Sequence, residues 1–208
     1  MKRPQIQRKT RNTILIITNG KETEKNYFKS ITSKYKTEFK IKVDDQNGEC
    51  DKLVQYACGF NQTDYNQIWC VFDIDESFNE GHLINALKMA RENNINIAYS
   101  NEDFELWLLY HLTAIVSPAL ERKRYIHEIN EHLKHIGYKY KKSDSKLIRE
   151  IFIPKIPEAL HNAKTYCQKL EAEYQKEYGN DKFPIWKWKS STTVYKLIEA
   201  MKLEEKDN

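Results

Sequence analysis

Asp73 and Asp75 are the residues whose spacing points most directly to chemistry. They stand in the segment FDIDE, directly after the apolar run 68–72. If the chain stays extended here, both carboxylates project to the same side, because alternate residues of a strand share a face. Carboxylates placed in this way can share Mg²⁺ or Mn²⁺, which accepts phosphate oxygens in its other positions. The alternative is a hydrogen-bonded turn that leads into a helix at Gly81.

A second candidate site follows the apolar run TILIIT at 13–18, where the chain continues as Asn19, Gly20 and Lys21. Gly20 relieves the steric restriction on the backbone at the turn. A helix that starts near Glu22 would offer free N–H groups and a positive dipole end to an anion. We therefore predict that Asn19, Gly20 and Lys21 bind phosphate.

Glu22 and Glu24 admit two interpretations. As acidic residues in the first turn of a helix, they would complement its dipole, which is a purely structural role. Alternatively they approach the cation that Asp73 and Asp75 bind, in which case Glu22 is a third metal ligand. The sequence leaves both interpretations open.

Glu105 lies in the segment SNEDFELWLLYH at 100–111, which reads as a helix capped at Ser100 or Asn101. The surrounding residues are too apolar to lie on a surface, so Glu105 needs a cation or a hydrogen-bond donor. His111 could be that donor only if the fold brings it near, because six residues along a helix separate the two side chains widely. We expect Glu105 to face the other acids as a metal or network ligand, and the alternative is a structural buried pair.

Alternating strand and helix patterns predict how these residues are positioned. The apolar or alternating runs that predict strands are 13–18, 38–45, 67–73 and 95–100, and helical segments lie between them at about 22–36, 51–62 and 81–93. This rhythm predicts an α/β fold with a parallel sheet, right-handed crossovers and helices on both faces. Polar or acidic residues follow every strand, and the carboxyl ends of parallel strands meet at one rim. Like charges that converge there require a cation.

Length and composition exclude several classes. The 208 residues can bury one substantial core, and 34 basic against 30 acidic residues give a formal charge of +4, too small to prove a nucleic-acid partner. No apolar run has the length of about 20 residues that spans a bilayer, so we expect a cytoplasmic protein without a membrane partner. The four cysteines lack Cys-x-x-Cys spacing, and His132 and His135 read as a solvated helix face, so we do not expect a zinc site.

The chain divides by composition into a basic tail at 1–12, an α/β core at 13–116 and a helical region at 117–208 that packs on the core. Two segments of the helical region interleave basic and aromatic residues, which can contact phosphates and stack on bases. The candidate nucleic-acid-binding residues are Lys141, Lys142, Trp186, Lys187, Trp188 and Lys189. The alternative is that the aromatic rings are packed and the lysines only solubilise the surface.

Three segments, in the order ILIITNGKETEKNYF, IWCVFDIDE and IAYSNEDFELWLLYHL, resemble the RloB family, whose members are associated with bacterial restriction-modification loci and phage defence. The segment at 100–111 is the most specific, and the residues in it that match the family's pattern are Phe104, Glu105, Trp107 and His111. STTVYKLI at 191–198 is similar to the family's C-terminal block. Because the matching segments extend across most of the chain, it is identified as a member.

The RloB family is similar in turn to Toprim domains, the βαβ module of topoisomerases, primases and OLD-type nucleases. This resemblance implies a Toprim-like sheet and Mg²⁺- or Mn²⁺-dependent cleavage of phosphodiesters, with Asp73 and Asp75 as metal ligands. Toprim proteins carry a catalytic glutamate before the glycine of the first loop, whereas this chain has Asn19 there. An amide cannot carry a proton through a reaction.

Two function classes follow from this resemblance. If Glu22 or Glu24 takes over the acid–base role, with Glu105 as a further residue of the acidic site, the chain is an active nuclease in anti-phage defence. Otherwise it is a catalytically impaired module that binds a nucleic acid or a partner protein from the same defence locus. The acidic residues favour the nuclease, and Asn19 favours the binding module.

Overall fold

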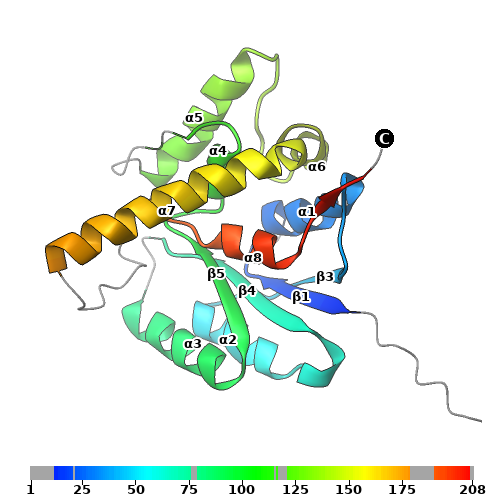
Figure 1. Cartoon of the computed structure of the whole chain (residues 1–208), viewed down its shortest axis with the longest axis vertical. Coiled ribbons are helices and arrows are strands. Elements are labelled where there is room, and N and C mark those ends of the chain that lie inside the picture. The colour runs from blue at the N-terminus through cyan, green and yellow to red at the C-terminus, as the bar shows by residue number, and fades with distance from the viewer. Residues whose placement is uncertain are drawn as a thin grey trace, which may run out of the picture.

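A parallel β-sheet forms the centre of the computed structural model, which describes residues 12–20, 22–75, 79–114, 116, 121–178 and 190–206. Within these residues, four strands lie in the order β3-β1-β4-β5, and all neighbouring pairs are parallel (Figure 1). Their bounds are β1 Thr13–Thr18, β3 Lys40–Asp45, β4 Gln67–Asp73 and β5 Ile95–Ser100. The predicted α/β class with a parallel sheet is confirmed.

Helices cover both faces of the sheet. On one face lie α2 (Cys50–Cys58) and α3 (Glu80–Glu92), and on the other lies α1 (Thr23–Ser30) together with the C-terminal helices (Figure 1). The sequence of β1 explains this arrangement, because Ile14 and Ile16 pack into the core beside α1 whereas Leu15 and Ile17 pack beside α2 and α3. Complete burial of each such side chain contributes about 1.5–3 kcal/mol relative to exposure.

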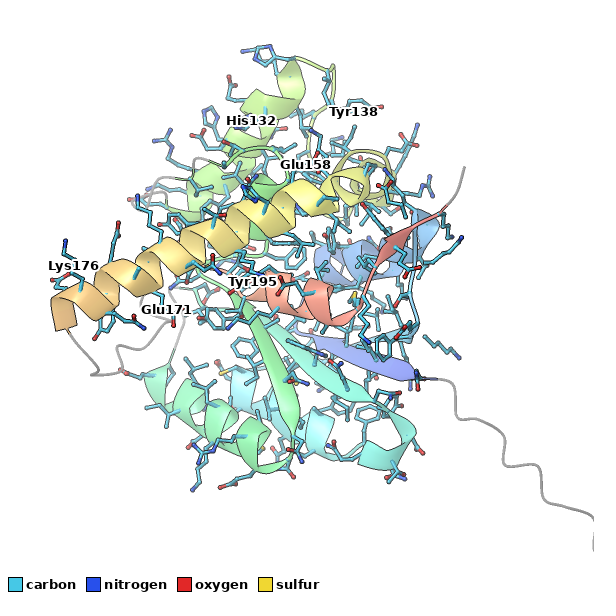
Figure 2. The ribbon with its side chains drawn as sticks, in the orientation of Figure 1. His132, Tyr138, Glu158, Glu171, Lys176 and Tyr195 are labelled. Atoms are coloured by element: carbon cyan, nitrogen blue, oxygen red, sulfur yellow. The ribbon has the colours of Figure 1, made fainter. Side chains whose placement is uncertain are left out.

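The C-terminal region is helical, as predicted, and it enlarges the core beside α1. Its helices are α5 Arg122–Lys134, α6 Ser145–Leu147, α7 Ile156–Tyr178 and α8 Val194–Ala200, and they follow α4 Glu105–Tyr110 of the core segment. Between α6 and α7 the chain forms a π-helical turn at Ile148–Phe152 and a 3-10 turn at Ile153–Lys155. The last part of α7, which bears Glu171 and Lys176, extends past the edge of the sheet (Figure 2). In the described part of the chain, no helix combines the length and hydrophobicity needed to cross a bilayer.

The chain returns to the sheet near its C-terminus. Thr193 donates its backbone N–H to the Tyr99 carbonyl at 2.8 Å, and Asn101 donates to the Ser191 carbonyl at 2.9 Å. These bonds cover the outer edge of β5 and hold the loop after it. A short antiparallel pair of β2 (Tyr35–Lys36) and β6 (Glu204–Glu205) follows.

Three expectations about element ends are wrong. The first helix ends at Ser30 instead of continuing to 36, because Tyr35 and Lys36 pair with β6, a partner that is remote in sequence. The same pair places a short strand, β6, in the region that was expected to be helical. The fourth helix begins at Glu105 and not after a cap at Ser100 or Asn101, since hydrogen bonds to the C-terminal segment hold the intervening backbone. The proposed domain boundaries stay a prediction.

Candidate functional site

The loops after β1 and β4 diverge at the centre of the sheet. From β1 the chain passes to β3 on one side, and it later returns to β4 on the other side of β1. In open α/β sheets, ligands bind in the crevice that such a reversal creates at the carboxyl ends of the strands. A cavity of about 250 Å³ lies here, lined by Asn19, Gly20, Glu24, Gly48, Glu49, Cys50, Asp73, Asp75, Asn79 and Arg122.

Glu24 fits tightly against the turn after β1. It lies in the first turn of α1 with 6% of its surface exposed. Thr18 Oγ1 donates to the Gly20 carbonyl at 2.9 Å, which holds the turn, and any β-carbon at Gly20 would overlap the Glu24 carboxylate. Burial raises the pKa of Glu24, and the charge of Asp103 adds to the increase. Gly20 is therefore required here by close approach and not by an unusual backbone angle.

Asp73 is the last residue of β4 and lines the same cavity. Burial raises its pKa well above the ordinary value, and the charges of Asp103, Glu24 and Glu105 raise it further. Neither Asp73 nor Glu24 forms an ion pair with another residue in the described part of the chain. The site thus concentrates negative charge that a cation would neutralise.

The alternative to metal binding by Asp73 and Asp75 is a structural role, in which they form the hydrogen-bonded turn into the next helix. Asn79 caps this helix, because its Oδ1 accepts hydrogen bonds from Gly81 N at 2.9 Å and His82 N at 3.4 Å at the start of α3. Asp73 and Asp75 are therefore not needed as helix caps.

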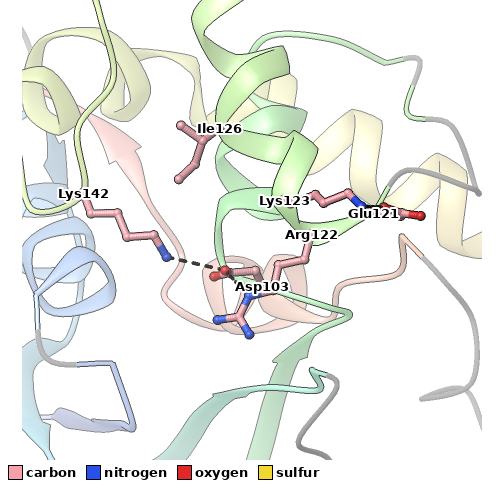
Figure 3. Close-up of a pocket in the computed structure, with 6 residues that line it drawn as sticks. All are labelled: Asp103, Glu121, Arg122, Lys123, Ile126 and Lys142. Atoms are coloured by element: carbon pink, nitrogen blue, oxygen red, sulfur yellow. Dashed lines mark hydrogen bonds and ion pairs between the residues drawn. The ribbon is translucent and has the colours of Figure 1, made fainter.

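Arg122 contributes a cation that the sequence analysis missed. It is the first residue of α5, and its Nη1 lies 2.6 Å from Asp75 Oδ2. Its Nε lies 2.8 Å from Asp103 Oδ2 (Figure 3). Its backbone N–H donates to Glu102 Oε2 at 3.0 Å. The only local signal was the basic run ERKR, which is also typical of a solvated helix.

Glu105 and Asp103 form a second group beside Asp73. Lys142 Nζ lies 3.2 Å from Glu105 Oε1 and 3.5 Å from Asp103 Oδ2, and the Tyr140 hydroxyl donates to Glu105 Oε1 at 2.9 Å. Burial, followed by the hydrogen bond to Asp103, raises the pKa of Glu105 to about 8. Although burial opposes it, the hydrogen bond from Glu105 and the charges of Lys142 and Arg122 lower the pKa of Asp103 to about 2. The two shifts have opposite directions, so the proton that this pair shares favours Glu105 over Asp103.

Most of the residues proposed from the sequence meet at this rim. A second cavity of about 290 Å³ is lined by Gly20, Glu22, Thr23, Glu24, Asp73, Asp103, Glu105, Arg122 and Lys142. It shares four of these residues with the first cavity. Asn19, Asp75 and Glu105 thus lie around one acidic region, and Glu22 lies at its exposed margin.

The remaining proposed residues are either away from the cavities or not described. Lys141 is exposed and lines neither cavity, and Lys21, Trp186, Lys187, Trp188 and Lys189 lie outside the described residues. His111 does not reach Glu105, because its Nε2 accepts from the Tyr27 hydroxyl at 3.0 Å and its Nδ1 donates to the Trp107 carbonyl at 2.9 Å.

The carboxylates after β3 also lie apart from the acidic region. Asp45 pairs with Lys25, and Asp44 accepts a hydrogen bond of 3.0 Å from the Tyr56 hydroxyl. The expectation that every strand end delivers polar or acidic groups to one rim is therefore wrong for β3.

The donor set of the acidic region suits a hard divalent cation, because Glu24, Asp73 and Asp75 offer only carboxylate oxygens. Among the described residues, however, no three His, Cys, Asp or Glu side chains stand close enough together to hold a metal ion. The contact between Asp75 and Arg122 accounts for part of this, since it directs one carboxylate of the Asp-x-Asp pair toward the guanidinium. The chemistry of the residues fits the metal, because Mg²⁺ usually binds through one or two carboxylates and completes its coordination with water and phosphate oxygens.

Comparison with known proteins assigns this chain to a family. The family described as RloB-like protein matches residues 14–201. No curated protein and no solved structure matches the chain. The match spans β1 to the end of α8 and includes every residue of both cavities. This chain therefore belongs to the RloB-like protein family.

Proposed function

We propose that this protein is a Mg²⁺- or Mn²⁺-dependent nuclease that cleaves nucleic-acid phosphodiesters in bacterial defence against phage. The observation that carries the proposal is the pair Glu24 and Asp73, a buried and a half-buried carboxylate that line one cavity at the reversal point of the sheet. Membership of the RloB-like family supports assignment to defence-associated proteins.

Asp73 and Asp75 would hold the metal ion, with Glu22 as a further ligand. The bound ion would neutralise the carboxylates and polarise the phosphate. Asn19 and Gly20 line the cavity, and the Asn19 amide would donate a hydrogen bond to a phosphate oxygen. Lys142 lines the second cavity, and it would add positive charge for the nucleic acid.

Proton transfer would belong to glutamates and not to Asn19. The pKa of Glu105 at about 8 lets this side chain gain and lose a proton near neutral pH. Glu24 also has a raised pKa. Its carboxylate packs against Gly20, next to Asn19, which occupies the position of the Toprim glutamate. We assign the acid–base role to Glu24 and a supporting role to Glu105.

A second candidate function is binding without cleavage. Asn19 favours it, because the position that carries a catalytic glutamate in Toprim proteins here carries an amide. In this case the acidic region would bind a cation and the protein would act through a nucleic acid or a partner protein.

One experiment separates the two functions. Labelled single-stranded DNA, duplex DNA, RNA and tRNA are incubated with the protein in Mg²⁺ or Mn²⁺, and products and binding are measured. The variants are Asp73→Asn and, as a matched control, Asp64→Asn, which alters an exposed aspartate far from both cavities. Cleavage by the native protein and the control, but not by Asp73→Asn, supports the nuclease. Binding without cleavage supports the module, and the absence of both contradicts the two proposals.

A further inference from the structure

Arg122 lies at the boundary between three cavities. It lines the two cavities of the acidic region and a third of about 390 Å³, whose other lining residues are Asp103, Glu121, Lys123, Ile126 and Lys142 (Figure 3). The guanidinium bridges Asp75 on one side and Asp103 on the other, at 2.6 Å and 2.8 Å. A positive group from α5 therefore occupies the acidic rim of the sheet.

The side chain of Arg122 can leave this position while its backbone stays fixed. Its side chain is 40% exposed, and its N–H is anchored on Glu102 at the start of α5. Asp75 is 23% exposed, so water can replace the guanidinium on this carboxylate. Rotation of one side chain is enough to change which group pairs with Asp75.

We propose that Arg122 is the cation of this site in the absence of metal, and that it transfers to a phosphate of the nucleic acid when a divalent ion takes Asp75. This inference rests on the proposed function. It adds a competition between a protein side chain and the metal, and it names the group that binds the backbone phosphate. The guanidinium suits both partners, because its fork of N–H donors matches carboxylates and phosphates alike.

The third cavity offers a place for that phosphate. In Figure 3 the side chains of Arg122 and Lys142 approach Asp103 from two sides, and Lys123 lies further along the same wall with Glu121. A nucleic-acid phosphate between Arg122 and Lys142 would replace the Asp103 carboxylate as the common partner of these two cations. Such contacts are charge-assisted and contribute to affinity without reading sequence.

The test uses the full chain and the variant Arg122→Gln. Arg124→Gln is the matched control, because Arg124 is the same residue type in the same helix turn, pairs only with Glu128 among the described residues and lines none of the three cavities. Mn²⁺ affinity is measured by calorimetry without nucleic acid. Loss of a competing positive charge predicts a Kd for Mn²⁺ about tenfold lower in Arg122→Gln and unchanged in Arg124→Gln.

Nucleic-acid affinity is measured separately with labelled single-stranded DNA and RNA oligonucleotides, with Ca²⁺ in place of the catalytic metal. Arg122→Gln is expected to bind about tenfold more weakly, and the slope of log K against log salt falls by about 1. The two effects have opposite signs. A residue that only supported the fold would weaken both affinities together.

The outcomes distinguish this inference from the proposed function. If the native protein binds no Mn²⁺, both fail. If it binds Mn²⁺ but Arg122→Gln binds it no more tightly, or binds oligonucleotides as well as the native protein does, the inference alone is overturned. If Arg122→Gln does not fold, Arg122→Lys decides, because it keeps the charge and loses the fork. Native-like Mn²⁺ affinity with weaker oligonucleotide binding supports the inference, and native affinity for both contradicts it.

Discussion

The hydroxyl of Tyr140 donates a hydrogen bond of 2.9 Å to Oε1 of Glu105, which ties the loop after α5 to the acidic rim of the sheet. Both side chains are 2% exposed. Lys142, from the same loop, lies 3.2 Å from the same oxygen. The helical region therefore supplies donors that the sheet itself lacks, and the acidic region depends on the packing of both parts.

Tyr140→Phe is expected to lower the free energy of unfolding by about 1 kcal/mol, because it removes a buried hydrogen bond without changing the ring. It also raises the pKa of Glu105 further, since the Tyr140 hydroxyl lowers that pKa in the native protein. Urea unfolding and carboxyl ¹³C titration by NMR measure the two effects. The control is Tyr138→Phe, two residues away and 41% exposed beside the end of α5 (Figure 2). Equal stability of the two variants would contradict the prediction.

The stability of Glu105→Gln relative to the native protein is expected to increase as the pH rises. The folded-state pKa of Glu105 is about 8, against an ordinary value of 4.5. Between these values the unfolded chain has released a proton that the folded chain still holds, so native stability falls by up to ~1.4 kcal/mol per pH unit. The glutamine has no such loss.

Urea unfolding at pH 5, 6.5 and 8 measures this difference. Glu92→Gln, which changes an exposed glutamate at the end of α3, is the control and should track the native protein at all three values. A constant difference between Glu105→Gln and the native protein across this range would show that Glu105 titrates normally.

The sheet and part of the acidic region were predictable from local sequence. Runs such as TILIIT and QIWCVFD are apolar and rich in β-branched or aromatic residues, and both form strands. Because the carboxyl ends of parallel strands meet at one edge, the proximity of Gly20 to Asp73 follows from strand order alone. The sequence could not provide Arg122 and Tyr140 as partners, since their positions depend on how the helical region packs. Local sequence also could not show that Lys25, from α1, pairs with Asp45 at the end of β3.

His111 is expected to support the fold and not the metal. Burial lowers its pKa to about 3, and it bonds the Tyr27 hydroxyl and the Trp107 carbonyl. His111→Gln should therefore lose about 1–3 kcal/mol of unfolding free energy at pH 7 and keep native Mn²⁺ affinity.

The pH dependence gives a second readout for His111. As the pH falls from 6.5 toward 3, the unfolded chain binds a proton that the folded histidine refuses, so the native protein loses stability that the variant does not lose. The control His132→Gln changes an exposed histidine of α5 and should behave like the native protein. Weaker Mn²⁺ binding in a folded His111→Gln would instead connect this residue to the acidic region.

Gly20→Ala is expected to be destabilising only while Glu24 is present. A β-carbon at this turn would overlap the Glu24 carboxylate, and relief of such overlap typically costs about 1–3 kcal/mol. In a Glu24→Ala background the overlap is gone, so the same substitution should cost less than about 0.5 kcal/mol. Urea unfolding of the native protein, both single variants and the double variant gives the coupling between the two positions. Additive costs would mean that the glycine is needed for another reason, and that the tight fit of Glu24 against the turn does not fix the geometry of the acidic region.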